Sequence, residues 1–101
     1  MSESDLEDYL ILRVLEEPIT QEDLQAVDER STAIRQELND EGITVLSVES
    51  EVLTDDQGNV TGTHCHYQAE GEGAVREHAK RAELPISRID RPGRALGGDF
   101  D

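Results

Sequence analysis

The side chains that could do chemistry in this chain gather in one segment, from Thr63 to Ile89. This segment holds all three histidines, His64, His66 and His78, and the single cysteine, Cys65. Imidazole nitrogen and thiolate sulfur bind transition metals, and a histidine beside a cysteine can also act as base and nucleophile. Metal binding and nucleophilic chemistry are therefore the two activities that the segment suggests.

His64 and His66 form a His-x-His pattern on a predicted strand over 60–69. Alternate residues of a strand point to the same face, so both imidazoles project in one direction, about 7 Å apart along the chain. Neutral imidazole suits nickel, zinc, copper or iron, and a carboxylate or a third histidine would complete a site. The alternative is that they are two polar residues on a partly exposed sheet face.

Cys65 lies on the other face of this strand, and His78 belongs to the apolar stripe of a predicted helix that Pro85 closes. One chain should therefore not bring all three histidines to a single metal. Either His64 and His66 take further ligands from a partner subunit, or His78 works with Cys65 as a soft metal site or as base and nucleophile. In the alternative reading, Cys65 is a buried thiol and His78 makes one hydrogen bond.

The elements that position these side chains alternate between strands and helices. Hydrophobic periodicity predicts a first strand over 9–15, a helix over 21–38, strands over 43–53 and 60–69, a helix around 75–82, and a last strand over 86–91. Thr20 followed by Asp23 resembles a capping box, and Gly42 is suited to end the first helix. The order β-α-β-β-α-β predicts a ferredoxin-like α+β fold, with an antiparallel four-stranded sheet, both helices on one face, and the first and third strands at the centre.

We expect a single domain over residues 9–92, an acidic mobile leader over 1–8 and a flexible tail over 93–101. Only 35% of the residues are hydrophobic and there is no tryptophan, so the core is thin for a chain of 101 residues. We therefore expect a homodimer in which a second sheet covers the helix-free face, giving a dimeric α+β barrel.

The helix-free face is expected to carry side chains from both central strands. These are Tyr9, Ile11 and Arg13 from the first strand, beside His64, His66 and Gln68 from the third. If paired sheets enclose a cavity, Tyr9, Arg13 and the two histidines would line it, and the cavity would bind or transform a small molecule.

The formal net charge of −15 comes from 24 acidic and nine basic residues. The acids are scattered over helices and turns, which favours adaptation of the whole surface to a concentrated-salt cytoplasm over a patch for one basic partner. The same charge argues against binding of nucleic acid, which relies on lysine and arginine. There is no apolar run of membrane-spanning length and no basic signal peptide, and one cysteine fits a reducing interior, so we expect a cytoplasmic protein away from membranes.

The chain also resembles a known family. The motif Cys65-x-Tyr67, the run Ala74 to Ala79, and the pairs Leu84-Pro85 and Arg88-Ile89 are similar to a family of small ferredoxin-like proteins of unknown function that includes a nickel-binding protein. The resemblance covers most of the chain and leaves out both tails. It implies the same fold, pairing of subunits, and nickel or another divalent transition metal as ligand.

Three functions remain open at this point. The first is a small metal-binding protein, the second a dimeric barrel that binds or transforms a small molecule, and the third a salt-adapted interaction module without chemistry. No P-loop, nucleophile elbow or Ser-His-Asp signature is present, which favours a binding role over catalysis.

Overall fold

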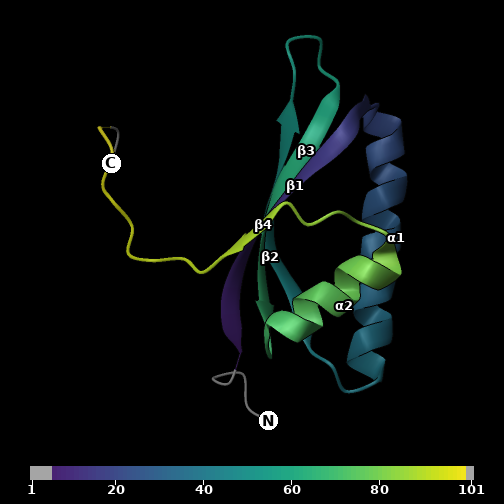
Figure 1. The fold of residues 1–101 in the computed structure, drawn as a ribbon, viewed down its shortest axis with the longest axis vertical. Coiled ribbons are helices and arrows are strands. Elements are labelled where there is room, and N and C mark those ends of the chain that lie inside the picture. Colours follow the sequence, from purple (N-terminus) through teal and green to yellow (C-terminus); the bar gives the residue numbers. More distant parts are fainter. Residues whose placement is uncertain (1–5, 100–101) are drawn as a thin grey trace.

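The computed structural model describes residues 6–99, and these fold as the predicted β-α-β-β-α-β succession. Figure 1 shows one sheet with both helices on the same side of it. The elements are β1 (Glu7–Ile19), α1 (Gln21–Asp40), β2 (Val45–Thr54), β3 (Val60–Ala69), α2 (Glu72–Ala82) and β4 (Arg88–Asp90). The ferredoxin-like architecture inferred from the order of the elements is thus confirmed.

The four strands run in the order β2-β3-β1-β4, and every neighbouring pair is antiparallel. The first and third strands therefore lie at the centre, as the element order predicted. Strand β1 begins two residues earlier than expected, so Glu7 and Asp8, which we had assigned to the leader, belong to the sheet. Residues 1–5 and 100–101 of the expected leader and tail lie outside the described residues, and 91–99 contain no helix or strand.

Local signals in the sequence explain where α1 begins and ends. The Thr20 hydroxyl accepts a hydrogen bond from the Asp23 amide at 3.0 Å, and the Asp23 carboxylate accepts one from the Thr20 amide at 3.4 Å, which completes a capping box. At the other end Gly42 adopts a φ of +86°, and Ile43 N–H returns to the Leu38 carbonyl at 2.8 Å. This Schellman-type ending suits glycine because the left-handed region carries no penalty for it.

The faces of β1 differ from the prediction. Tyr9, Ile11 and Arg13 are 3%, 0% and 2% exposed, and they lie on the helix side of the sheet. The antiparallel register places Ile11 opposite Cys65, and opposed residues share a face. The assignment of these three residues to the helix-free face was therefore wrong. That face instead receives the alternate set of β1, which is Leu10, Leu12 and Val14, beside His64 and His66.

The physical reason for this difference is packing volume. Tyr9 and Ile11 pack in one core with Tyr67 of β3 and Val75 of α2, and a protein this poor in aromatic residues has few other bulky side chains to fill that space. The face that helix α2 buries is made mostly of small residues, which are Ala74, Val75, Ala79 and Ala82 in addition to His78.

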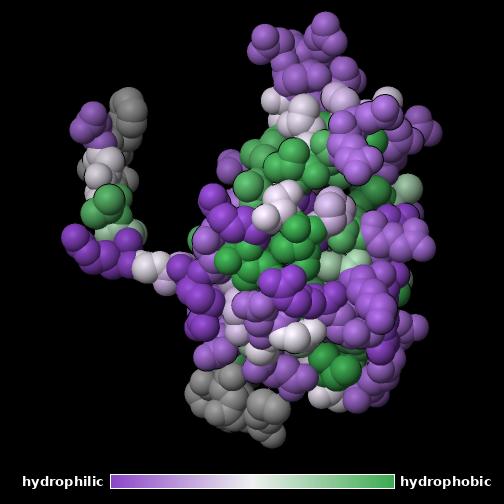
Figure 2. All heavy atoms as spheres, viewed as in Figure 1, coloured by the Kyte–Doolittle hydropathy of each residue, from purple (hydrophilic) through white to green (hydrophobic). Residues whose placement is uncertain are grey.

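The surface of the protein is mostly hydrophilic (Figure 2), as expected for a chain with 24 acids and few hydrophobic residues. Figure 2 shows hydrophobic side chains gathered over the middle of the visible face, with hydrophilic ones covering the β2–β3 hairpin tip and the outer side of α1. No helix within residues 6–99 is both long and apolar enough to cross a membrane.

Candidate functional site

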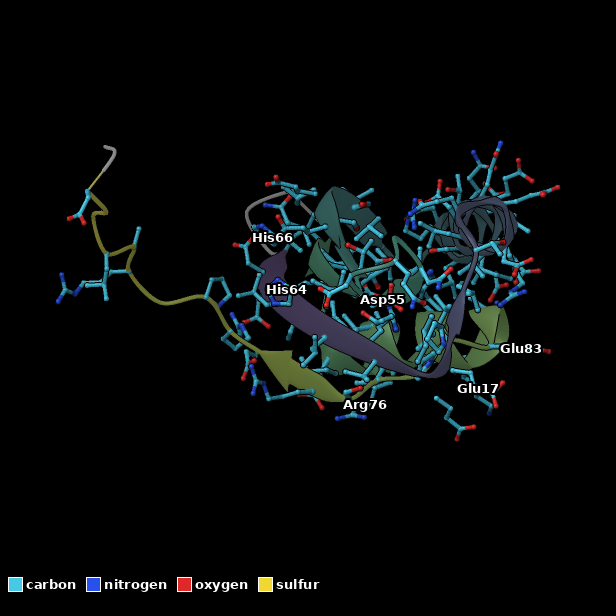
Figure 3. The ribbon with its side chains drawn as sticks, turned by 90° about the horizontal axis from the view of Figure 1, so that it is seen from above. Glu17, Asp55, His64, His66, Arg76 and Glu83 are labelled. Carbon is cyan, nitrogen blue, oxygen red and sulfur yellow. The ribbon has the colours of Figure 1, made fainter. Side chains whose placement is uncertain are left out.

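Strand β3 distributes the chemically active side chains over the two faces of the sheet. Cys65 and Tyr67 are buried toward the helices, whereas His64 and His66 are half-buried on the open face. Figure 3 shows both histidines on the side of the sheet away from α1. The two faces are thus separate candidate sites, and side chains on one face do not contribute to a site on the other.

On the open face, His66 is held by an acid from the neighbouring strand. Its Nε2 lies 2.8 Å from the Asp8 Oδ1, and Gln68 donates to the same oxygen at 3.2 Å. The hydrogen bond from His66 is the main reason why the pKa of the Asp8 carboxyl is lowered, and the bond from Gln68 adds to it. Asp8 is therefore ionised at neutral pH and accepts the Nε2 proton of His66.

Two further acids face these histidines from β2. Glu49 pairs with His66 and Glu51 with His64 in the β2–β3 register, so each acid shares the open face with its partner. A register shift between Ser47 and Glu49 puts the acids there, as the extra residue of a bulge changes which side chains point outward. The sequence pattern singled out the two histidines, and only the strand register identifies Glu49, Glu51 and Asp8 as their neighbours.

Imidazole nitrogen with carboxylate oxygen is a donor set that divalent transition metals accept. Even so, no three histidine, cysteine, aspartate or glutamate side chains within residues 6–99 lie close enough together to hold an ion. Within the described residues, one chain thus brings His66 and Asp8 together at the open face without a third donor beside them. Any metal bound there would need ligands from water or from a second copy.

On the helix side, Cys65 and His78 each have a partner of their own. Cys65 is 5% exposed and its Sγ donates to Thr63 Oγ1 at 3.6 Å. His78 is fully buried, with its Nε2 at 3.2 Å from the Ser31 carbonyl and 3.1 Å from the Ser31 hydroxyl. Within the described residues no hydrogen bond joins Cys65 to His78, so the geometry gives no support to a base–nucleophile pair.

His78 is a neutral donor in this environment. Burial lowers its pKa to about 4, and the charges of Arg13 and Arg35 act in the same direction. Its Nε2 carries the proton that the Ser31 carbonyl accepts, and its Nδ1 is buried without a hydrogen-bond partner. The ring also packs edge-on against Tyr67, with the centroids 5.4 Å apart. From α2, His78 therefore holds Ser31 by hydrogen bonds and Tyr67 by ring packing.

The two predicted cavity residues, Tyr9 and Arg13, lie on the helix side of the sheet and not on the open face. Tyr9 donates to Glu7 at 2.9 Å, and burial is the main cause that raises its pKa. Arg13 donates through Nη1 to the Pro85 carbonyl at 3.0 Å, and its guanidinium lies 5.9 Å from the centre of the Tyr67 ring. Its Nε and Nη2 are buried without a hydrogen-bond partner. Arg13 does line a cavity, but this cavity lies between helix and sheet within one chain and is partly open to solvent.

This cavity has a volume of about 360 Å³ and lies between α1 and the inner face of the sheet. Arg13, Tyr67 and Cys65 line it from the central strands, and Ser31 and Arg35 line it from α1. Arg35 donates to the Ser31 hydroxyl at 2.7 Å and lies 5.6 Å from the centre of the Tyr67 ring. Neither Arg35 nor Ser31 was predicted as a site residue, although Ser31 in the middle of an apolar helix stripe was a signal.

Comparison with known proteins identifies the family. A family model described as "Nickel responsive protein SCO4226-like" matches residues 9–91. The chain belongs to this family. The resemblance inferred from the motifs between Cys65 and Ile89 is thereby confirmed. The matched range includes all three histidines and Arg13, whereas Asp8 lies just before it.

A solved structure shows the same fold. The crystal structure of SCO4226 from Streptomyces coelicolor A3(2) is 17% identical in sequence, with a TM-score of 0.64. The alignment covers 88% of this chain and 99% of that one. Among curated proteins no significant match was found.

Proposed function

We propose that this protein binds a divalent transition metal, with nickel the first candidate, through His64 and His66 on the open face of the sheet. The observation that carries the proposal is the contact of 2.8 Å between His66 Nε2 and Asp8 Oδ1, with His64 on the same face of the same strand. The family description, nickel responsive, supports a metal-related role.

The chemistry of the open face suits such an ion. Asp8 is ionised, and a metal would replace the proton that it now shares with His66. The acids Glu49 and Glu51 opposite the histidines add negative charge to the same surface. Imidazole must be deprotonated to act as a ligand, so affinity should fall as the solution is made acidic.

A second copy of the chain is the proposed source of the missing ligands. The open face carries apolar side chains around its histidines: Val14 and Leu46 are 53% and 40% exposed, and Leu10 and Leu12 are half-buried. Covering such a surface with the same surface of another copy would bury it and bring a second pair of imidazoles to the interface. The homodimer is thus part of the proposed function.

Calorimetric titration with Ni²⁺ and with Zn²⁺ tests this proposal. Wild type should show saturable binding at one ion per two chains if the interface completes the site. The double variant His64→Ala/His66→Ala should lose this binding, and Asp8→Asn should weaken it. His78→Gln is the matched control, because it removes a histidine from the helix side and should bind like wild type. Full affinity in the double variant would place the metal elsewhere and refute the assignment.

We also propose that the acidic surface is an adaptation to concentrated salt in the cytoplasm. Support comes from the distribution of the acids, which occur on α1, β2, α2 and the connecting turns. Screening of their mutual repulsion would then stabilise the fold without any specific partner.

A further inference from the structure

The arginines of this protein differ in their partners. Arg30 and Arg94 are exposed, and Arg30 donates to the Ala82 carbonyl at 2.6 Å. Four other arginines form ion pairs with acids on the surface, which are Arg76 with Glu72, Arg81 with Glu37, Glu41 and Glu77, Arg88 with Asp90, and Arg91 with Glu7. Arg13 and Arg35, in contrast, form no ion pair with any residue from 6 to 99. In a chain with 24 acids and nine bases, two arginines without a carboxylate partner in one cavity need an explanation.

Arg13 is the more unusual of the two. Its side chain is among the most deeply buried polar groups in the protein, at 2% exposure. One nitrogen, Nη1, donates to the Pro85 carbonyl, while Nε and Nη2 have no hydrogen-bond partner. A guanidinium removed from water is costly unless hydrogen bonds and a counter-charge compensate for it. The free nitrogens of Arg13 therefore indicate a missing acceptor.

The backbone holds Arg13 in this position. Gly62 lies opposite Val14 in the β1–β3 register, and a side chain there would collide with the Arg13 carbonyl. The two central strands can approach closely at this point because residue 62 has no Cβ. The Tyr67 ring, 5.9 Å from the guanidinium carbon, gives a further favourable contact to the cation.

Arg35 reaches the same cavity from α1. Its Nη1 donates to the Ser31 hydroxyl at 2.7 Å and its Nη2 to the Thr32 hydroxyl at 3.2 Å. Its guanidinium lies 5.6 Å from the centre of the Tyr67 ring, so both cations flank one aromatic side chain. Because neutral oxygens hold Arg35, its positive charge remains available to a ligand.

The remaining lining of the cavity contains both polar and apolar side chains. Ser47, Ser50 and Thr63 contribute hydroxyls, while Leu24, Val27 and Val52 contribute apolar surface. One acid, Asp28, lies at the lining, so the two arginines leave a net positive charge inside a strongly negative protein. A volume of about 360 Å³ is at the lower end of the range for cavities that bind small molecules.

We propose that this cavity binds a small organic anion whose carboxylate or phosphate head lies between Arg13 and Arg35 and whose apolar body lies against Leu24, Val27 and Val52. A planar guanidinium matches a two-oxygen anion with two parallel hydrogen bonds, and Arg13 has two donors free for this purpose. The site is independent of the proposed metal site, because it lies on the opposite face of the sheet.

The test uses hexanoate and phenyl phosphate as probes, in calorimetric titrations of the whole protein at constant KCl. Wild type should bind at least one of them at one molecule per chain, and 1-hexanol, which has the same body as hexanoate but no charge, should not bind. Arg35→Gln should weaken the binding at least tenfold, and Arg13→Met should abolish it. Bound probe should also raise the melting temperature of wild type.

Two controls make the result specific. Arg76→Gln removes an exposed, ion-paired arginine on α2 and should leave affinity unchanged. The variant His64→Ala/His66→Ala should also bind the probe like wild type, so that failure of the metal proposal does not affect this one. Arg35→Gln alters a partly exposed residue and keeps the test valid if Arg13→Met does not fold. Absence of binding by wild type, or equal affinity in Arg35→Gln and Arg76→Gln, would overturn the proposal.

Discussion

Replacement of His78 by glutamine should reduce the loss of stability that the protein shows between pH 7 and pH 5. The imidazole is fully buried, and its pKa is about 4 in the folded protein, whereas an unfolded chain has a histidine pKa of ~6.5. Between these two values the unfolded state binds a proton and the folded state does not. Stability contributed by neutral His78 is therefore present above pH ~6.5 and is lost as the pH falls toward 4.

The magnitude follows from the size of the pKa difference. Each unit of pH below the unfolded pKa costs about 1.4 kcal/mol, so a change from pH 6.5 to pH 5 should remove about 2 kcal/mol from the free energy of unfolding. Glutamine can place its amide nitrogen near the position of the His78 Nε2, so that the hydrogen bond to the Ser31 carbonyl can be kept without a titrating group.

Urea unfolding at pH 7 and pH 5 measures this difference. Wild type and His78→Gln contain the same carboxylates, so their common titration cancels when the two pH dependences are subtracted. The variant should lose about 2 kcal/mol less than wild type between these pH values. His64→Gln, on the half-buried open face, serves as control and should behave like wild type. If His78→Gln and wild type have parallel pH profiles, His78 is not the buried neutral group described above.

Two further predictions concern the open face and the acidic surface. Val14→Asp, at a position 53% exposed on the open face, should convert the proposed homodimer to a monomer in light scattering. Leu96→Asp, at a position 78% exposed in the tail, is the control and should leave the mass unchanged. An unchanged mass for both variants would mean that the interface lies elsewhere. The melting temperature should rise between low and multimolar KCl because salt screens repulsion among the 24 acids, and a flat response would require a basic partner to explain the acidity.

The fold could be predicted because its signals are local. The capping box at Thr20, the ending at Gly42 and the alternation from His64 to Ala69 each depend on neighbours within a few residues. The order of the elements then left few ways to form a sheet. Strand β1 was predicted too short because Glu16 to Pro18 resembles a turn, whereas the structure continues the strand through a shift of register between Val14 and Ile19.

The site was harder to predict because it depends on which alternate set of β1 faces the helices. Alternation separates Tyr9, Ile11 and Arg13 from Leu10 and Leu12, but both sets contain apolar side chains, and nothing local decides between them. The presence of a charged arginine favoured the open face for the first set. The bulk of Tyr9 and Ile11 favoured the core, and the packing of these side chains determined the outcome.

The burial of Arg13 is informative because of the composition of the chain. A protein with this excess of acids could pair almost any arginine with a carboxylate, and it does so at Arg76, Arg81, Arg88 and Arg91. Arg13 differs from these because its guanidinium is buried and two of its nitrogens have no hydrogen-bond partner among the described residues. Packing alone would be satisfied by methionine or leucine in this place, without the desolvation of a charge. The charge of Arg13 is therefore best explained by a ligand that approaches it in the cavity.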